Sequence, residues 1–225
     1  MTEHPLDNPI WSALTTNHAH LALGDGSARR YPLAITALTG LRAADSTGFA
    51  DLAAMVAPGS VVPLFLASPE PPPFDVVYSR DIAQMVCAQP IASPAGFAIT
   101  PLGVADVAEM LALVELTKPG PFGPRTIQFG DFFGIRVQGQ LAAMAGTRLR
   151  PQGFTEISAV CTHPDFQRRG YGEALVRQVA AVVQARHEIA CLHVKTDNAQ
   201  AVRTYEKLGF IQRRVIHLRT VRLPG

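Results

Sequence analysis

The chain has 225 residues, of which 48% are hydrophobic and 17% are charged, and this composition excludes a disordered chain. No apolar run approaches the roughly 20 residues that a membrane-spanning helix needs, and the first residues do not form a secretory signal, so we expect a cytoplasmic protein without a membrane partner. Because Cys87, Cys161 and Cys191 show no paired spacing, we expect neither a disulfide framework nor a metal site.

Charge is unevenly distributed along the chain. Residues 1–90 carry 4 arginines and 8 acidic residues, a net charge of −4, whereas residues 91–225 carry 16 basic and 10 acidic residues, a net charge of +6. The second part therefore suits an anionic ligand. Because its basic residues are scattered, without interleaved aromatic residues or long basic runs, a compact phosphate-bearing ligand is favoured over a nucleic acid.

The first part of the chain, residues 1–92, is predicted to be an α/β region that ends in proline-rich punctuation. Its pattern predicts a hairpin, a strand, a helix and a strand over residues 20–31, 33–41, 46–56 and 60–67. This order returns later in the chain, so the region is a candidate degenerate repeat of the fold that follows. A coincidental order of elements is the alternative.

The second part, residues 93–225, contains a longer series of elements. Strands are predicted over residues 98–101, 131–137, 141–147, 157–162 and 191–194, helices over 104–116, 172–187 and 198–208, and a terminal strand or hairpin over 210–223. The order is neither a strict strand–helix alternation nor an all-β run. We therefore predict an α/β fold in which helices flank a mixed, mostly antiparallel sheet.

A glycine-bearing turn links the strand that ends at Thr162 to the next predicted helix. A helix N-terminus presents unpaired backbone N–H groups and the positive end of its dipole, which suits phosphate. Gly170 and Gly172 would let the backbone approach a ligand closely, and Arg168 or Arg169 could add charge. Ordinary turn chemistry is the alternative. Neither a dinucleotide fingerprint nor a P-loop is completed, which excludes the common dehydrogenase and NTPase sites.

At this point the sequence resembles a known family. Residues 156–176 resemble the acetyl-CoA-binding motif of the GNAT superfamily, whose signature is Gln/Arg-x-x-Gly-x-Gly/Ala. The signature positions are Gln167, Gly170 and Gly172. Residues 198–210 are similar to the second motif of the same family, at the separation that one helix and one strand require. The resemblance covers about residues 96–225 and implies a GNAT-like fold with acetyl-CoA as co-substrate.

The resemblance also implies which residues bind the cofactor. In this family the strand before the turn splays from its neighbour, and its exposed backbone binds the pantetheine arm like an added strand. Asn198 would reach the same arm, although an ordinary helix N-cap is an equally consistent role. The expected cofactor-binding residues are Val160, Thr162, Gln167, Arg168, Arg169, Gly170, Tyr171, Gly172 and Asn198.

Two residues are implied to be catalytic. Tyr205 would protonate the departing CoA thiolate, the alternative being a core aromatic. Glu156 would take the proton from the acceptor amine, the alternatives being an exposed charge at a strand end or a chain of water molecules. Between the first helix and the hairpin, the loop with Thr117 and Phe122 would form the acceptor wall, the alternative being a simple connector.

The function implied is the transfer of an acyl group, most often acetyl, from acyl-CoA to a primary amine of a small molecule or protein by direct attack. A catalytically silent acyl-CoA-binding sensor or partner subunit is the main alternative. A nucleotide-binding module that uses only the glycine turn is less favoured, because the second motif lies in register with the first.

Overall fold

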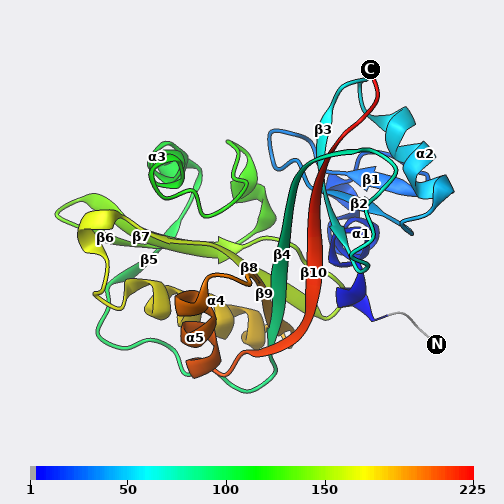
Figure 1. The fold of residues 1–225 in the computed structure, drawn as a ribbon. Coiled ribbons are helices and arrows are strands. Elements are labelled where there is room, and N and C mark those ends of the chain that lie inside the picture. Colours follow the sequence, from blue (N-terminus) through cyan, green and yellow to red (C-terminus); the bar gives the residue numbers. More distant parts are fainter. Residues whose placement is uncertain (1–3) are drawn as a thin grey trace.

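The computed structural model describes residues 4–225, which form a ten-stranded sheet covered by helices (Figure 1). The helices are α1 (Pro9–Thr15), α2 (Ser46–Met55), α3 (Val107–Thr117), α4 (Tyr171–Ala185) and α5 (Ala199–Lys207). The strands are β1 (Ala28–Arg30), β2 (Thr39–Leu41), β3 (Val61–Leu66), β4 (Asp75–Cys87), β5 (Ile99–Leu102), β6 (Phe132–Val137), β7 (Gln140–Thr147), β8 (Phe154–Thr162), β9 (Ile189–Lys195) and β10 (Ile211–Arg222). None of the helices described over residues 4–225 has the length and apolar character to span a bilayer.

The strands are ordered β1-β2-β3-β10-β4-β9-β8-β7-β6-β5 across the sheet. Two neighbouring pairs, β2–β3 and β8–β9, are parallel, and the other pairs are antiparallel. A helix connects the two strands of each parallel pair, as the geometry of a parallel connection requires. The predicted α/β fold with a mixed, mostly antiparallel sheet is therefore confirmed.

Strand β4 lies in the stretch that the sequence pattern marks as a boundary between two regions. It is the longest strand of the sheet and pairs with β10 on one side and with β9 on the other. Because a proline run precedes β4 and its first residues are exposed, its sequence pattern resembles that of a linker. The boundary predicted near residue 92 thus does not separate two independent sheets. Helix α1 is also unpredicted, and β2 spans only the end of the strand predicted over residues 33–41.

The three strands on each side of the β10–β4 pair match one another, and β6 and β5 extend the second side further. In the first half of the chain, through β4, the antiparallel pair β1–β2 is followed by α2 and by β3, parallel to β2. In the second half, β7–β8 is followed by α4 and by β9, parallel to β8. The next strand of each half pairs with the other half: β4 with β9, and β10 with β3. This exchange of strands supports the idea of a degenerate repeat.

Helices cover both faces of the second half of the sheet, with α4 and α5 on one face and α3 on the other (Figure 1). The buried side chains of α4 are Ala174, Leu175, Val176, Val179, Ala180 and Val183. All of them except Ala174 share a cluster with Met85 of β4, Ile157 of β8 and Leu192 of β9. On the opposite face, Met110 and Leu113 of α3 pack in a second cluster over β6, β7 and β8. This packing sets the N-terminus of α4 next to the end of β8.

Candidate active site

Strands β8 and β9 diverge before they end. Their parallel pairing runs from Phe154–Ile189 to Ile157–Leu192, although β8 continues to Thr162 and β9 to Lys195. On its other edge β8 has a bulge opposite β7, where Ala159 takes a left-handed conformation with φ of +52°. The diverging strands leave backbone edges that an extended ligand arm can pair with. This wedge is the splayed geometry that the resemblance implies.

The turn between β8 and α4 presents a row of free donors. Arg168 and Gly170 both have positive φ, +61° and +79°, which bends the chain sharply ahead of the helix. Among residues 4–225, no acceptor is found for the backbone N–H groups of residues 168–172. The turn is exposed, and it opens a helix of 15 residues. Exposed N–H groups at a helix N-terminus form a binding site for an anion such as pyrophosphate.

The two glycines of the turn face different neighbours. A Cβ on Gly172 would lie 3.8 Å from Thr162 Oγ1 and 4.0 Å from Val160 Cγ1, so this glycine faces the diverging part of β8. A Cβ on Gly170 would lie 3.4 Å from Cζ of Phe97. The expected cofactor-binding residues of β8 and of the turn are therefore brought together. Tyr171 is half-buried, with its ring edge-on to Phe97.

The arginines of the turn differ in their freedom. Arg169 lies over the ring of Phe166, with 5.2 Å from its guanidinium carbon to the ring centroid, and donates to Asp165 O at 3.3 Å. Arg168 and Gln167 are both exposed, and Arg168 has no ion pair or hydrogen-bond partner within residues 4–225. The side chain of Arg168 is thus the freer of the two to meet an anionic ligand.

Helix α5 carries the two remaining expected residues. Asn198 is the N-cap, and its Oδ1 accepts a hydrogen bond from Ala201 N at 3.1 Å, so the capping role is confirmed. Tyr205 lies seven residues along the helix, about 10 Å away at 1.5 Å per residue, and packs against Phe210. Its hydroxyl makes no hydrogen bond to any group in residues 4–225, and burial raises its pKa to about 12. A neutral, unengaged phenol is suited to donate a proton.

Glu156, the expected base, is buried, so the alternative of an exposed charge at a strand end is wrong. Its side chain is 1% exposed and forms a bidentate pair with Arg148, with distances of 2.6 and 2.9 Å. Leu149 N and His193 Nδ1 lie 3.3 and 2.7 Å from its oxygens. Burial by itself would raise the pKa of Glu156, but the charge of Arg148 and the hydrogen bonds from Arg148 and His193 hold it well below the usual range. A carboxylate that is enclosed and stabilised in this way is a poor proton acceptor.

His193 and Gln84 extend this buried network, and sequence patterns mark neither residue. The amide nitrogen of Gln84 donates to Leu6 O at 2.8 Å and lies 3.1 Å from His193 Nε2. That nitrogen of His193 must therefore accept, so its Nδ1 carries the proton that Glu156 accepts. Gln84 Oε1 in turn accepts from Arg213 at 2.9 Å. Both ring nitrogens of His193 are thus engaged, and the network joins β8, β9, β4 and β10.

The loop expected to form the acceptor wall is fixed from two sides. Phe122 is half-buried, with its ring edge-on to Phe132. Thr117 is half-buried and donates to Leu113 O at 2.6 Å. Just beyond the loop, Arg125 N donates to Ala34 O at 2.9 Å, which ties it to the first half. The role of this loop in acceptor binding stays a prediction.

The described part of the chain holds no cluster of three or more metal-ligating side chains. Residues 132–219 match the model of the FR47-like protein family. Over 79 residues, 35% of this chain, the sequence is 33% identical to the ribosomal protein bS18-alanine N-acetyltransferase of Escherichia coli K12. That match covers 53% of the relative, so the chain spans about half the length of the curated relatives it matches.

Solved structures extend the likeness over the whole chain. A GCN5-related N-acetyltransferase from Kribbella flavida, 16% identical, covers 96% of each chain with a TM-score of 0.60 and shares the fold. A protein assigned to the GNAT family of acetyltransferases, from Novosphingobium aromaticivorans, is 35% identical over 99% of this chain and 100% of its own, with a TM-score of 0.92. In agreement with the two sequence motifs, this full-length likeness shows that the chain belongs to the GNAT family.

Proposed function

We propose that the protein transfers an acyl group, most often acetyl, from acyl-CoA to a primary amine. The observation that carries the proposal is the divergence of β8 and β9 next to the turn with free N–H groups. The wedge can take the pantetheine arm along the backbone of β8, and the turn can take the pyrophosphate. The thioester would then lie between the diverging ends of β8 and β9.

The chemistry needs a proton to leave the amine and another to reach the sulfur. The amine attacks as a free base, because an ammonium has no lone pair. Since Glu156 is enclosed by its partners, we assign the first proton to water in the wedge and give Glu156 a structural role. Tyr205 supplies the second proton to the CoA thiolate, and its raised pKa keeps it protonated at the pH of the reaction.

The acceptor class rests on the relatives. The matched Escherichia coli protein acts on an alanine of ribosomal protein bS18. A peptide beginning with alanine therefore belongs in the amine panel beside small primary amines. The first experiment incubates the protein with acetyl-CoA and each amine and follows the release of free thiol. Binding of CoA without thiol release from any amine would favour the alternative, a silent acyl-CoA sensor.

Tyr205→Phe provides the sharper test, because it removes only the hydroxyl. We expect the turnover rate to fall about 10- to 1,000-fold, the usual contribution of a positioned acid, with the affinity for CoA nearly unchanged. Because burial raises the pKa of Tyr205 to about 12, its phenol stays protonated up to about pH 10. The wild-type rate should therefore not fall through deprotonation of Tyr205 below that pH.

The matched control is Tyr31→Phe, which removes a buried hydroxyl that lies 2.9 Å from His18 Nδ1 in the cluster below α1. This change should alter stability but leave the rate of transfer intact. Wild-type turnover by Tyr205→Phe, with chemistry limiting, would return Tyr205 to the role of a core aromatic.

A further inference from the structure

The loop that carries Asn198 is held by β4, a strand from the first half of the chain. Arg80 Nη1 lies 3.1 and 2.8 Å from the two carboxylate oxygens of Asp197, the residue before Asn198. One residue earlier, the backbone N and the hydroxyl of Thr196 donate to Asp81 O at 3.3 and 3.2 Å. These contacts begin where the pairing of β9 with β4 ends, at Lys195.

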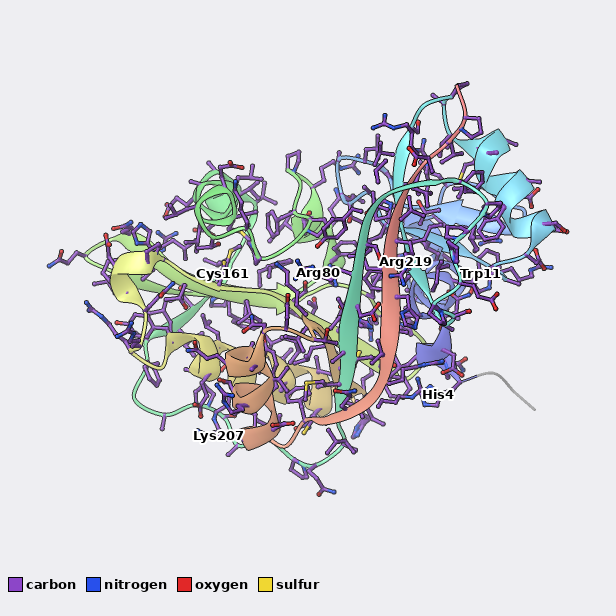
Figure 2. All side chains as sticks on the ribbon, viewed as in Figure 1. His4, Trp11, Arg80, Cys161, Lys207 and Arg219 are labelled. Carbon is purple, nitrogen blue, oxygen red and sulfur yellow. The ribbon has the colours of Figure 1, made fainter. Side chains whose placement is uncertain are left out.

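Arg80 is itself held in one orientation. Its Nε donates to the hydroxyl of Tyr78 at 2.6 Å, and its guanidinium carbon lies 5.8 Å from the centroid of the Tyr78 ring. Tyr78 and Arg80 are two residues apart on one strand and so share a face of the sheet. Figure 2 labels Arg80 beside β4. The guanidinium therefore meets Asp197 with little freedom of its own.

This loop, residues 196–198, leads directly into α5, the helix that carries Tyr205. Asn198 follows Asp197 and caps α5 through Ala201 N, and Tyr205 lies further along the same helix. A displacement of Asp197 would move the cap, and with it the start of the helix. Because the Arg80 and Asp197 side chains are 32% and 69% exposed, their ion pair adds little to the stability of the fold. The contact constrains local geometry more than it stabilises the molecule.

We propose that Arg80 is a positioning residue, which acts through Asp197 to place Asn198 and the start of α5 for the acyl-CoA arm. The inference rests on the proposed function. It gives the first half of the chain a part in the cofactor site of the second half, by way of the exchanged strand β4. Asn198 still contacts the acyl-CoA arm, and Arg80 fixes the position of Asn198.

The test compares Arg80→Ala, Asp197→Ala and the double variant. Each single change should weaken CoA binding and raise the KM for acetyl-CoA by about 3- to 10-fold, with kcat within about twofold of wild type and the acceptor KM unchanged. The double variant should be no weaker than either single variant. Exchange of the charges, Arg80→Asp with Asp197→Arg, should recover most of the affinity.

A direct contact between Arg80 and the cofactor would give a different pattern. In that case Asp197→Ala would leave CoA binding unchanged or strengthen it, and the exchanged pair would not rescue it. Either result overturns the positioning role. Arg136→Ala is the matched control, because Arg136 is 30% exposed and pairs with two carboxylates, Asp106 and Glu109, in a different part of the second half. CoA affinity should be unchanged in this control.

Hydrogen exchange in the unliganded protein tests the clamp without any cofactor. The amide of Ala201 should exchange faster in Arg80→Ala than in wild type or Arg136→Ala, since it is the donor to the Asn198 cap. Equal exchange would overturn the clamp. If wild type binds no CoA, the proposed function fails and this role fails with it. If wild type binds CoA and Arg80→Ala binds it equally, only the positioning role is overturned.

Discussion

Gly170 and Gly172 lie two residues apart in the turn, but adding a side chain would have different effects at the two positions. Gly170 has φ of +79°, so any side chain there strains the backbone, and lost binding could not be separated from a damaged turn. Gly172 is not among the positive-φ glycines, and a Cβ there meets Val160 and Thr162 only at ordinary contact distance. Gly172 is therefore the better position at which to test the cofactor site.

We expect Gly172→Val to fold like wild type and to lose CoA affinity by about 100-fold, the equivalent of one or two hydrogen bonds to a charged group. The branched side chain would occupy the space between the turn and β8. Isothermal titration with CoA measures the loss, and thermal unfolding checks the fold. Gly103→Val makes the same change where nothing lies within 4 Å, and it should bind CoA normally. Normal binding by Gly172→Val would place the arm elsewhere.

The burial of Glu156 leads to a prediction about stability. Above the pKa of an unfolded carboxyl, Glu156 is ionised in both states and its pairing stabilises the fold. This contribution to stability is lost only as the pH falls from the pKa of an unfolded carboxyl through the lower pKa of folded Glu156. The pair is therefore intact at neutral pH. Glu156→Gln leaves the buried charge of Arg148 unmatched and should reduce the free energy of unfolding by about 3 to 5 kcal/mol.

Urea unfolding at neutral pH measures this loss. Replacing both partners, as in Arg148→Met with Glu156→Leu, should cost less than Glu156→Gln, because no unpaired charge stays buried. If Glu156→Gln instead has wild-type stability and slows transfer mainly at low pH, the original hypothesis of a general base is restored.

At the scale of elements, α2 and α4 occupy equivalent places in the two halves but have different N-termini. Asp45 caps α2, and its carboxylate accepts from Gly48 N at 2.8 Å. The carboxylate of Asp45 thus places a negative charge next to one of the first backbone N–H groups of α2. Gly170 caps α4 without a side chain, and the N–H groups of its turn have no acceptor within residues 4–225. The N-terminus of α2 is therefore less suited to bind an anion than the N-terminus of α4.

At the scale of the whole molecule, the exchanged strands make the halves interdependent. Without the first half, β9 and β10 lose β4 from between them, and the cluster under α4 loses Ala83, Met85 and Cys87. We expect residues 93–225 alone to show no cooperative unfolding by circular dichroism. Residues 73–225, which keep β4, should regain a transition with a lower midpoint than the full chain. A cooperative transition and normal CoA binding by residues 93–225 would show an independent domain.

The sequence by itself was sufficient for the features that depend on neighbouring residues. A glycine turn before a helix, an Asn N-cap and apolar residues at helical spacing are local, because each is set by the φ and ψ preferences and periodicity of one short segment. These features predicted α4, α5, the turn and the family, and the full-length likeness confirmed the family.

Only the tertiary structure decided the features that depend on distant partners. The sequence pattern around β4 resembles a linker because prolines precede it, and its identity as a central strand comes from pairing with β9 and β10, more than 100 residues later. Glu156 looks like a free strand-end carboxylate until folding brings Arg148 and His193 to it. The clamp of Arg80 on Asp197 joins residues 117 positions apart. No local preference encodes such pairs, because their energy exists only once the sheet has assembled.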